Sequence, residues 1–311
     1  MHAPINRNAG QATMKIRFWG TRGSISTPGK ETVRYGGNTP CVEVRLPNDD
    51  LIILDAGTGI RNLGEALMES GESVKAYIFV THPHWDHIQG FPFFKPAFVS
   101  GNELTIVGGQ MDKMTLQKMI SDQMNKVYFP VQLNELKATL KFHPIEEEEF
   151  SVYDAKVRSM YVNHPTFAIG FRITCGGKTL VYISDNEPFD RKVARSIRNV
   201  EKKIIDRFDR TSGDPNQRVF DFVKNADVLI HDTTYTPEEY VDRVGWGHSH
   251  YLFTLKVAAE GNVRRLVLFH HDPAHDDAKV DDILKKCKKE IQNRKYRFDC
   301  VSASEGLVLE I

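Results

Sequence analysis

The stretch that decides the fold is THPHWDH, residues 81–87, which directly follows the short apolar segment 74–80. An apolar segment of this length predicts a buried strand. In extended backbone, alternate residues project to the same side, so His82, His84 and Asp86 share one face. His87 breaks the alternation, where the chain can turn into a helix. One loop therefore offers four side chains of the types that bind metals.

Imidazole and carboxylate groups crowded in this way favour zinc, manganese or iron. Two histidines followed by an adjacent Asp-His pair suit two metal ions about 3.5–4 Å apart better than one ion. The alternative is a histidine-rich surface loop, which would explain a single histidine but not four such residues at the end of a strand. The sequence therefore predicts two divalent metal ions, with zinc or manganese favoured.

Composition sets wider limits. The chain has 311 residues, a formal net charge of +0 and 41% hydrophobic residues, so overall charge gives no sign of a nucleic-acid or membrane protein. No apolar run approaches the roughly 20 residues of a membrane span. Its four cysteines are scattered, which suits a reducing compartment, and we expect a cytoplasmic protein. We expect residues 1–13 to be a disordered tail and residues 14–311 to form one folded domain.

Apolar periodicity predicts an α+β fold, because strands occur both in meanders and in alternation with helices. The arrangement that fits is two mixed sheets covered by outer helices. Strands are expected at 14–19, 39–45, 51–55, 74–80, 104–107, 138–143, 150–163, 168–174, 179–184, 228–231, 265–270 and 302–311, and helices at 58–70, 113–125 and 252–260.

A basic helical insertion is expected at about 190–215. Apolar residues such as Val193, Ile197 and Ile204 keep helical spacing there, and the remaining face is rich in lysine and arginine. One interpretation is an ordinary surface helix with a solvated basic side. The other is a lid or phosphate-attracting rim near the active site.

The motif His-x-His-x-Asp-His after a strand resembles the signature of the metallo-β-lactamase superfamily, whose fold is an αββα sandwich. The superfamily's other motifs occur in the expected order along the chain. Leu54-Asp55-Ala56-Gly57 precedes the metal-binding motif, and His164 before a proline, Asp185 after an apolar strand and His270 after another come later. The resemblance spans roughly residues 14 to 311. It implies a first metal held by His82, His84 and His164, a second held by Asp86, His87 and His270, and Asp185 bridging both.

Each distant residue has a simpler interpretation: His164 as a turn residue, Asp185 as a cap, and His270 as the neighbour of an equally eligible His271. His270 is preferred because it directly ends the apolar run, and His271 and His275 stay unassigned. Asp55 is expected to orient a ligand imidazole rather than to bind metal.

Two further motifs resemble the phosphodiesterase branch of the superfamily. They are His231-Asp232-Thr233-Thr234 and Gly247-His248-Ser249. In that branch an acidic residue orients a histidine that faces the scissile phosphate, so the resemblance pairs Asp232 with His248, although aspartate here replaces glutamate. His248 could instead be a plain loop histidine. The turn at residues 20–24, GTRGS, could present amides to phosphate or be structural only.

We predict a dinuclear phosphodiesterase with Asp86, His248 and Asp232 as catalytic residues. A class B1 β-lactamase is disfavoured because it resembles this chain in the histidines but has cysteine where Asp185 stands. The long arm of many bacterial ribonucleases Z is missing between His164 and Asp185, which favours a small phosphodiester such as a cyclic nucleotide. Phosphodiesterases of this type often dimerise, so the resemblance implies a homodimer. Alternatives are a tRNA 3′-processing endoribonuclease, a lactone or thioester hydrolase, and a non-enzymatic binder of nucleic acid or protein.

Overall fold

Two seven-stranded mixed sheets form the centre of the molecule. The structure is a computed structural model that describes residues 13–111, 114–189 and 214–311. The first sheet has the order β14 (Val308–Glu310), β1 (Lys15–Gly20), β2 (Cys41–Arg45), β3 (Leu51–Leu54), β4 (Lys75–Val80), β5 (Glu103–Gly108), β6 (Thr139–Pro144). The second has the order β13 (Asp299–Ser302), β12 (Arg265–Phe269), β11 (Val228–Asp232), β10 (Lys178–Ile183), β9 (Ile169–Cys175), β8 (Ala155–Tyr161), β7 (Glu149–Val152).

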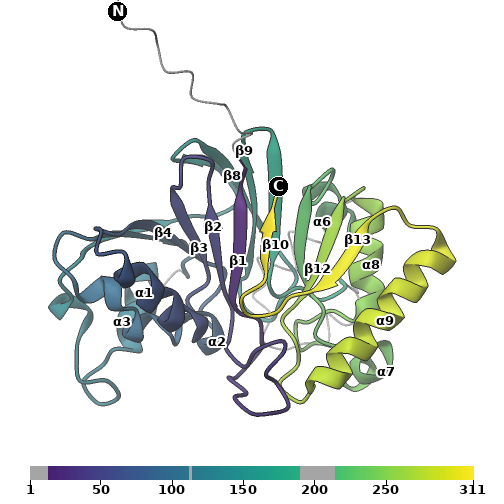
Figure 1. Ribbon diagram of the computed structural model, residues 1–311, viewed down its shortest axis with the longest axis horizontal. Coiled ribbons are helices and arrows are strands. Elements are labelled where there is room, and N and C mark those ends of the chain that lie inside the picture. Colours follow the sequence, from purple (N-terminus) through teal and green to yellow (C-terminus); the bar gives the residue numbers. More distant parts are fainter. Residues whose placement is uncertain (1–12, 112–113, 190–213) are drawn as a thin grey trace, which may run out of the picture.

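Helices cover the outer face of each sheet, as Figure 1 shows. The first sheet carries α1 (Gly59–Glu69), α2 (Trp85–Ile88) and α3 (Leu116–Asp122), and the second carries α6 (Gln217–Phe222), α8 (Tyr251–Glu260) and α9 (Asp277–Arg294). Shorter elements are α7 (Pro237–Tyr240) and four 3-10 turns at Phe91–Phe93, Lys95–Phe98, Leu133–Glu135 and Val241–Arg243.

The hydrophobic core is layered because strand side chains alternate between faces. In β3, Ile52 and Leu54 point between the two sheets, whereas Leu51 and Ile53 pack under the helices of the first sheet. Each such buried aliphatic side chain contributes roughly 1.5–3 kcal/mol to folding. The predicted αββα sandwich of two mixed sheets is therefore confirmed.

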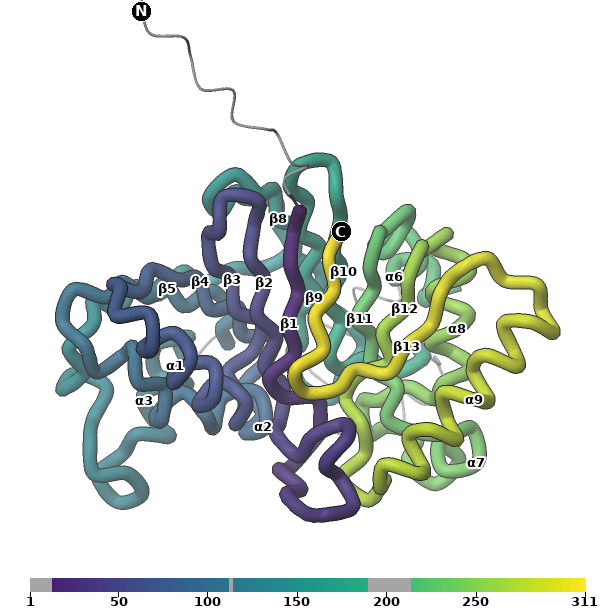
Figure 2. The backbone as a smooth tube through the Cα atoms, in the orientation of Figure 1, coloured from purple at the N-terminus to yellow at the C-terminus, as the bar shows by residue number. Residues whose placement is uncertain are grey.

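Several elements differ from the sequence prediction, among them the short helices α6 and α7, which were not predicted. The single strand expected at 150–163 is a hairpin of β7 and β8 that turns at Tyr153, whose φ is 51°. The single closing strand expected at 302–311 is split: β13 ends in the second sheet and β14 pairs with β1 in the first. Figure 2 shows this last segment crossing from one sheet to the other. The long helix α9 was not predicted.

The strand ends gather the residues that the motifs single out. The loop 81–87 follows β4, Asp185 follows β10, and His270 follows β12. Strands β3 to β6 run parallel to one another, as do β10 to β13, so the carboxyl ends in each set lie at one edge. Ligand sites of α/β sheets commonly form at such an edge.

Only a strand hairpin separates His164 from Asp185, as predicted. Strands β9 and β10 pair directly and turn at Gly176 and Gly177, whose φ angles are 58° and 77°. Two consecutive positive φ angles are those of the tight two-residue turn that glycines permit. The connection therefore holds no inserted arm.

Two of the predicted segments fall on residues 1–12 and 190–213, which lie outside the described residues: the disordered tail and the basic helical insertion. Within the described residues, no helix combines the length and the apolar character that crossing a membrane requires.

Candidate metal centre

Three histidines from two distant loops form the first cluster. His82 and His84 come from the loop after β4, and His164 comes from the loop after β8, with ligand atoms within 4.8 Å of one another. His164 Nε2 lies 3.2 Å from His84 Nδ1. Three imidazole nitrogens this close form a facial set for one metal ion.

A second cluster joins Asp86, His87 and His270, again with ligand atoms within 4.8 Å. Asp185 lies between the two clusters. Its Oδ1 is 3.1 Å from His87 Nε2, and its Oδ2 is 3.7 Å from His82 Nε2. The structure thus brings together all seven side chains that the sequence predicted as ligands. Their binding of metal stays a prediction.

Several buried atoms in this cluster have no hydrogen-bond partner, which tests whether metal ions fit. His82 Nε2, His87 Nε2 and Asp185 Oδ1 make no hydrogen bond of acceptable geometry, although the last two atoms lie 3.1 Å apart. Leaving buried polar atoms unpaired costs roughly 1–3 kcal/mol each, so such atoms normally have partners. The three atoms lie close together, and divalent cations bound among them would serve as their missing partners. The donor set fits a pair of metal ions.

The protonation states agree with this fit. Burial lowers the pKa of His82 well below its usual range and that of His164 to about 3, so both imidazoles are neutral, as metal ligands must be. Burial opposes charge on His87 as well, but the carboxylates of Asp86 and Asp185 raise its pKa well above the usual range. The excess of carboxylate around His87 marks a place that attracts positive charge.

Asp55 orients the His87 ring, as predicted. Its Oδ2 accepts a hydrogen bond from His87 Nδ1 at 2.8 Å and another from the Tyr182 hydroxyl at 2.7 Å. Its Oδ1 accepts the Thr81 amide at 2.8 Å. These bonds turn His87 Nε2 towards the cluster, and such partners raise the basicity of a ligand imidazole.

His164 is oriented by a loop that the sequence analysis did not assign to it. Its Nδ1 donates to the Gly247 carbonyl at 3.0 Å. Gly247 has a φ of +92°, and a Cβ there would lie 2.1 Å from His164 Nδ1, so no larger residue fits. Glu187 holds this loop by accepting the amides of Gly245 at 2.6 Å and Gly247 at 2.9 Å and the Tyr240 hydroxyl at 2.7 Å.

His270 is the histidine of the pair that reaches the cluster. Its Nε2 lies 3.2 Å from Asp86 Oδ2, and its Nδ1 lies 3.1 Å from the Thr234 hydroxyl. His271 points elsewhere, because its buried Nε2 donates to the Ala303 carbonyl at 2.9 Å. The preference for His270 agrees with this geometry, and the role of Thr234 was missed.

His248 lies beside the cluster and is paired with Asp232. Its Nδ1 is 3.1 Å from Asp232 Oδ2 and 3.6 Å from Asp185 Oδ2, and its ring stacks on His270 at 4.8 Å. Burial alone would lower its pKa, but the Asp232 carboxylate raises it to about 9. Asp232 is itself fixed by the Ser249 and Asn186 amides at 3.2 and 3.1 Å. The aspartate arm is therefore long enough for the predicted pairing.

The turn at residues 20–24 packs against the centre instead of presenting free amides. Ser24 N donates to Asp86 Oδ2 at 2.8 Å, and Gly23 N donates to the His271 carbonyl at 2.9 Å. The amides of Thr21 and Arg22 both donate to the Asn38 carbonyl. Between the two interpretations of this turn, the structure favours the structural one.

Known proteins resemble this chain in sequence and in fold. Residues 51–213 match the profile of the β-lactamase superfamily domain. The chain is 27% identical over 309 residues to a ribonuclease Z of Thermoplasma acidophilum, covering 90% of this chain and 93% of that protein. The metallo-β-lactamase fold protein YhfI of Bacillus subtilis superimposes with a TM-score of 0.66 at 20% identity, covering 96% of this chain and 99% of YhfI. The short form of human tRNase Z gives 0.61 at 19%, covering 95% and 98%.

The chain therefore belongs to the β-lactamase superfamily, as its motifs indicated. Its relatives place it in the ribonuclease Z-like branch, whose members cleave phosphodiesters, and it is a metal-dependent hydrolase of that branch. The fold implies divalent metal ions, and the donor set described above is where they fit.

Proposed function

We propose that the protein is a dinuclear phosphodiesterase that acts on a small phosphodiester, with cyclic nucleotides as the first candidates. The observation that carries the proposal is the His248–Asp232 pair, 3.1 Å apart and beside Asp185. The departing alkoxide of a phosphodiester must be protonated or have its charge neutralised, and a cationic histidine held by a carboxylate beside the metal cluster can supply that proton.

The proposed ligands are the seven side chains of the two clusters: His82, His84 and His164, then Asp86, His87 and His270, with Asp185 shared. When bound, two divalent ions, zinc or manganese, would supply hydroxide near neutral pH and neutralise charge on the phosphate oxygens. Asp86 Oδ2 accepts a hydrogen bond from Ser24 N, which fixes its orientation. We assign Asp86 the role of holding the attacking water by a hydrogen bond.

His248 is the proposed general acid. With its pKa at about 9, its imidazole carries a proton at neutral pH that it can donate to the leaving oxygen. Asp232 keeps the ring oriented and charged, because its carboxylate is held by two backbone amides and cannot turn away.

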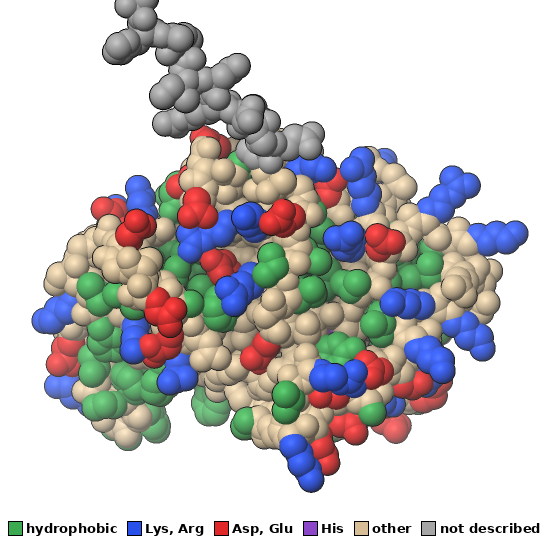
Figure 3. All heavy atoms as spheres, in the orientation of Figure 1, with side chains coloured by type: hydrophobic (Ala, Val, Ile, Leu, Met, Phe, Trp, Pro, Cys, Tyr) green, Lys and Arg blue, Asp and Glu red, His purple; other side chains and the backbone are tan. Residues whose placement is uncertain are grey.

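A small substrate is favoured by the short connection between His164 and Asp185, which is the β9–β10 hairpin alone. On the face shown in Figure 3, basic and acidic side chains are interspersed, so that face offers no extended positive surface for a nucleic-acid backbone. A second candidate is tRNA 3′-processing, which is favoured by the similarity to a protein named ribonuclease Z.

The test is a substrate panel with the full chain reconstituted with zinc or manganese. We expect hydrolysis of bis(p-nitrophenyl) phosphate and of at least one cyclic nucleotide, and little cleavage of a precursor tRNA with a 3′ trailer. Efficient trailer removal would shift the function to the second candidate. Turnover of lactones or S-acyl glutathione, with no dependence on His248, would replace both. Sedimentation of the same sample tests the expected homodimer.

A further inference from the structure

An apolar cavity of about 680 Å³ lies next to the loop that carries the metal-binding motif. Its wall consists mainly of hydrophobic and aromatic side chains, among them Pro83, Trp85, Phe93, Tyr128 and Phe129. The volume is within the range of about 300–1,000 Å³ that is common for small-molecule sites.

The cavity and the metal centre share the loop 81–87. Pro83 and Trp85 line the cavity, and they alternate with His82, His84 and Asp86, which belong to the clusters. His84 of the first cluster and Trp85 of the cavity wall are adjacent in the chain and both exposed, so the rim of the cavity begins one residue beyond a cluster residue. The motif loop thus separates a polar side that suits the phosphate from an apolar side that suits another part of the same molecule.

Aromatic rings in this wall are unusually exposed. Trp85 and Tyr128 keep 78% and 81% of their surface accessible, and Phe93 keeps 56% while its ring packs edge-on against Phe129 at 5.4 Å. Figure 3 shows hydrophobic side chains gathered over the end of the molecule that carries α1 and α3. Contiguous exposed apolar surface on a soluble domain commonly marks a binding site.

The charges of the wall decide what kind of group fits. Among the described residues the only lining side chain that is charged at neutral pH is Asp122, which is paired with Lys118 at 2.7 Å. No lysine or arginine of the described residues lines the cavity, so a second phosphate is disfavoured. Gln123 adds a specific feature, because its Nε2 is buried without a hydrogen-bond partner and can donate to a ring acceptor.

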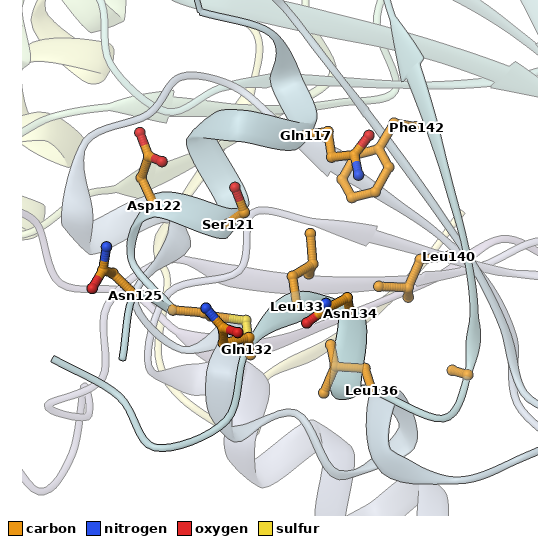
Figure 4. A pocket seen from close by; sticks show the side chains of 12 residues that line it. Gln117, Ser121, Asp122, Asn125, Gln132, Leu133, Asn134, Leu136, Leu140 and Phe142 are labelled. Carbon is orange, nitrogen blue, oxygen red and sulfur yellow. The ribbon is translucent and has the colours of Figure 1, made fainter. Parts of the chain in front are cut away.

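A neighbouring cavity shows the contrast. The space in Figure 4, about 590 Å³, shares Asp122 but is bordered by polar side chains such as Gln117, Asn125 and Asn134, and no residue of the loop 81–87 lines it. It has neither the aromatic wall nor the connection to the metal centre.

We propose that the apolar cavity binds an uncharged planar ring carried on one ester oxygen of the substrate, so that the substrate class is an aryl- or nucleobase-bearing phosphodiester. The inference rests on the proposed function for its phosphate half. The ring would stack on Trp85 and Tyr128, a contact that every planar π-face permits, and Gln123 would donate to a heteroatom at its edge.

The test compares two diesters that share the p-nitrophenolate leaving group and differ only in the other ester, phenyl p-nitrophenyl phosphate and methyl p-nitrophenyl phosphate. In the metal-reconstituted full chain we expect kcat/KM for the phenyl diester to exceed that for the methyl diester by about tenfold or more. Tyr128→Ser should remove most of that ratio. Val127→Ser is the matched control: Val127 is the adjacent residue, is 80% exposed and does not line the cavity, so both rates should stay unchanged.

Calorimetric binding of diphenyl phosphate and dimethyl phosphate gives a readout that needs no turnover. We expect diphenyl phosphate to bind more tightly than dimethyl phosphate, and Tyr128→Ser to weaken the binding of diphenyl phosphate. This expectation holds even if neither p-nitrophenyl diester is hydrolysed. A lack of hydrolysis would refute the proposed function but not the cavity inference. Equal affinities and equal kcat/KM values would overturn the cavity inference alone. It is also overturned if Tyr128→Ser splits a dimer and changes both rates equally, because the surface would then be a contact between two copies.

Discussion

Replacement of His248 by alanine is the sharpest perturbation of the proposed chemistry. The imidazole is buried, paired with Asp232 at 3.1 Å, and stacked on His270. Positioned acid–base groups contribute about 10²–10⁴ in rate, which corresponds to about 3–5 kcal/mol at 1.36 kcal/mol per tenfold. We therefore expect kcat for a cyclic nucleotide to fall about 100- to 10,000-fold.

The loop should keep its shape in this variant. Gly247 N still donates to Glu187, and Ser249 N still donates to Asp232, so the backbone on both sides of position 248 stays anchored. None of the proposed ligands is removed, and the metal content per chain should therefore equal that of the wild type. His250→Ala is the matched control, because His250 contacts the Tyr240 ring and is not part of the clusters.

The leaving group separates acid catalysis from a general loss of activity. An alkoxide such as the ribose oxygen of a cyclic nucleotide needs a proton to depart, whereas p-nitrophenolate needs little help. His248→Ala should therefore reduce turnover of the cyclic nucleotide much more than that of bis(p-nitrophenyl) phosphate. Equal losses on both substrates, or unchanged turnover of the cyclic nucleotide, would refute the role assigned to His248.

Three further outcomes follow from the same contacts. Asp55→Asn removes the charged acceptor of His87, so metal affinity measured by chelator competition should fall about 10- to 100-fold, and an unchanged affinity would contradict the orienting role. Glu187→Gln places an amide group against backbone N–H donors, so urea unfolding should show a loss of about 2 kcal/mol, and an unaltered midpoint would count against it. The pKa of His248 is raised to about 9, so the imidazole loses its catalytic proton, and kcat falls, as the pH rises through about that value. Bound cations screen the nearby carboxylates, which moves this fall to a somewhat lower pH. Asp232→Asn should move that alkaline limb to lower pH, and a limb that does not move would separate it from His248.

The local part of the site could be predicted from the sequence because strand periodicity is local. Alternation after an apolar strand is enough to place His82 and His84 on one side of the loop. Nothing in residue spacing brings His164 or Asp185 to that loop, since their convergence depends on the packing of two sheets. Only the order of motifs shared with a known superfamily predicted it.

The supporting residues could not be found in the same way. Tyr182 lies in an apolar strand of the second sheet, and its hydroxyl reaches Asp55 of the first sheet across 127 positions of sequence. A single polar atom in an apolar segment does not reveal its partner. Glu187 and Thr234 act through backbone groups and ring orientation, for which the sequence carries no periodic signal.

Helix α9 was missed because its apolar stripe is narrow. Val280, Ile283 and Cys287 are buried at helical spacing, but charged residues dominate the rest of the helix. The start signal was present, because the Asp276 side chain accepts the Lys279 amide as an N-cap. A count of i, i+3 and i+7 positions after that aspartate would have predicted the helix.

The central claim is that seven side chains from four strand-end loops hold two divalent ions. Its most direct test is the metal content of the reconstituted chain by mass spectrometry, together with X-ray absorption to find metal–metal scattering. We predict two ions per chain, separated by about 3.5–4 Å and bound by nitrogen and oxygen ligands. We also predict that Asp185→Ala abolishes the metal–metal signal. One ion per chain in the wild type, or a pair that survives Asp185→Ala unchanged, would contradict the claim.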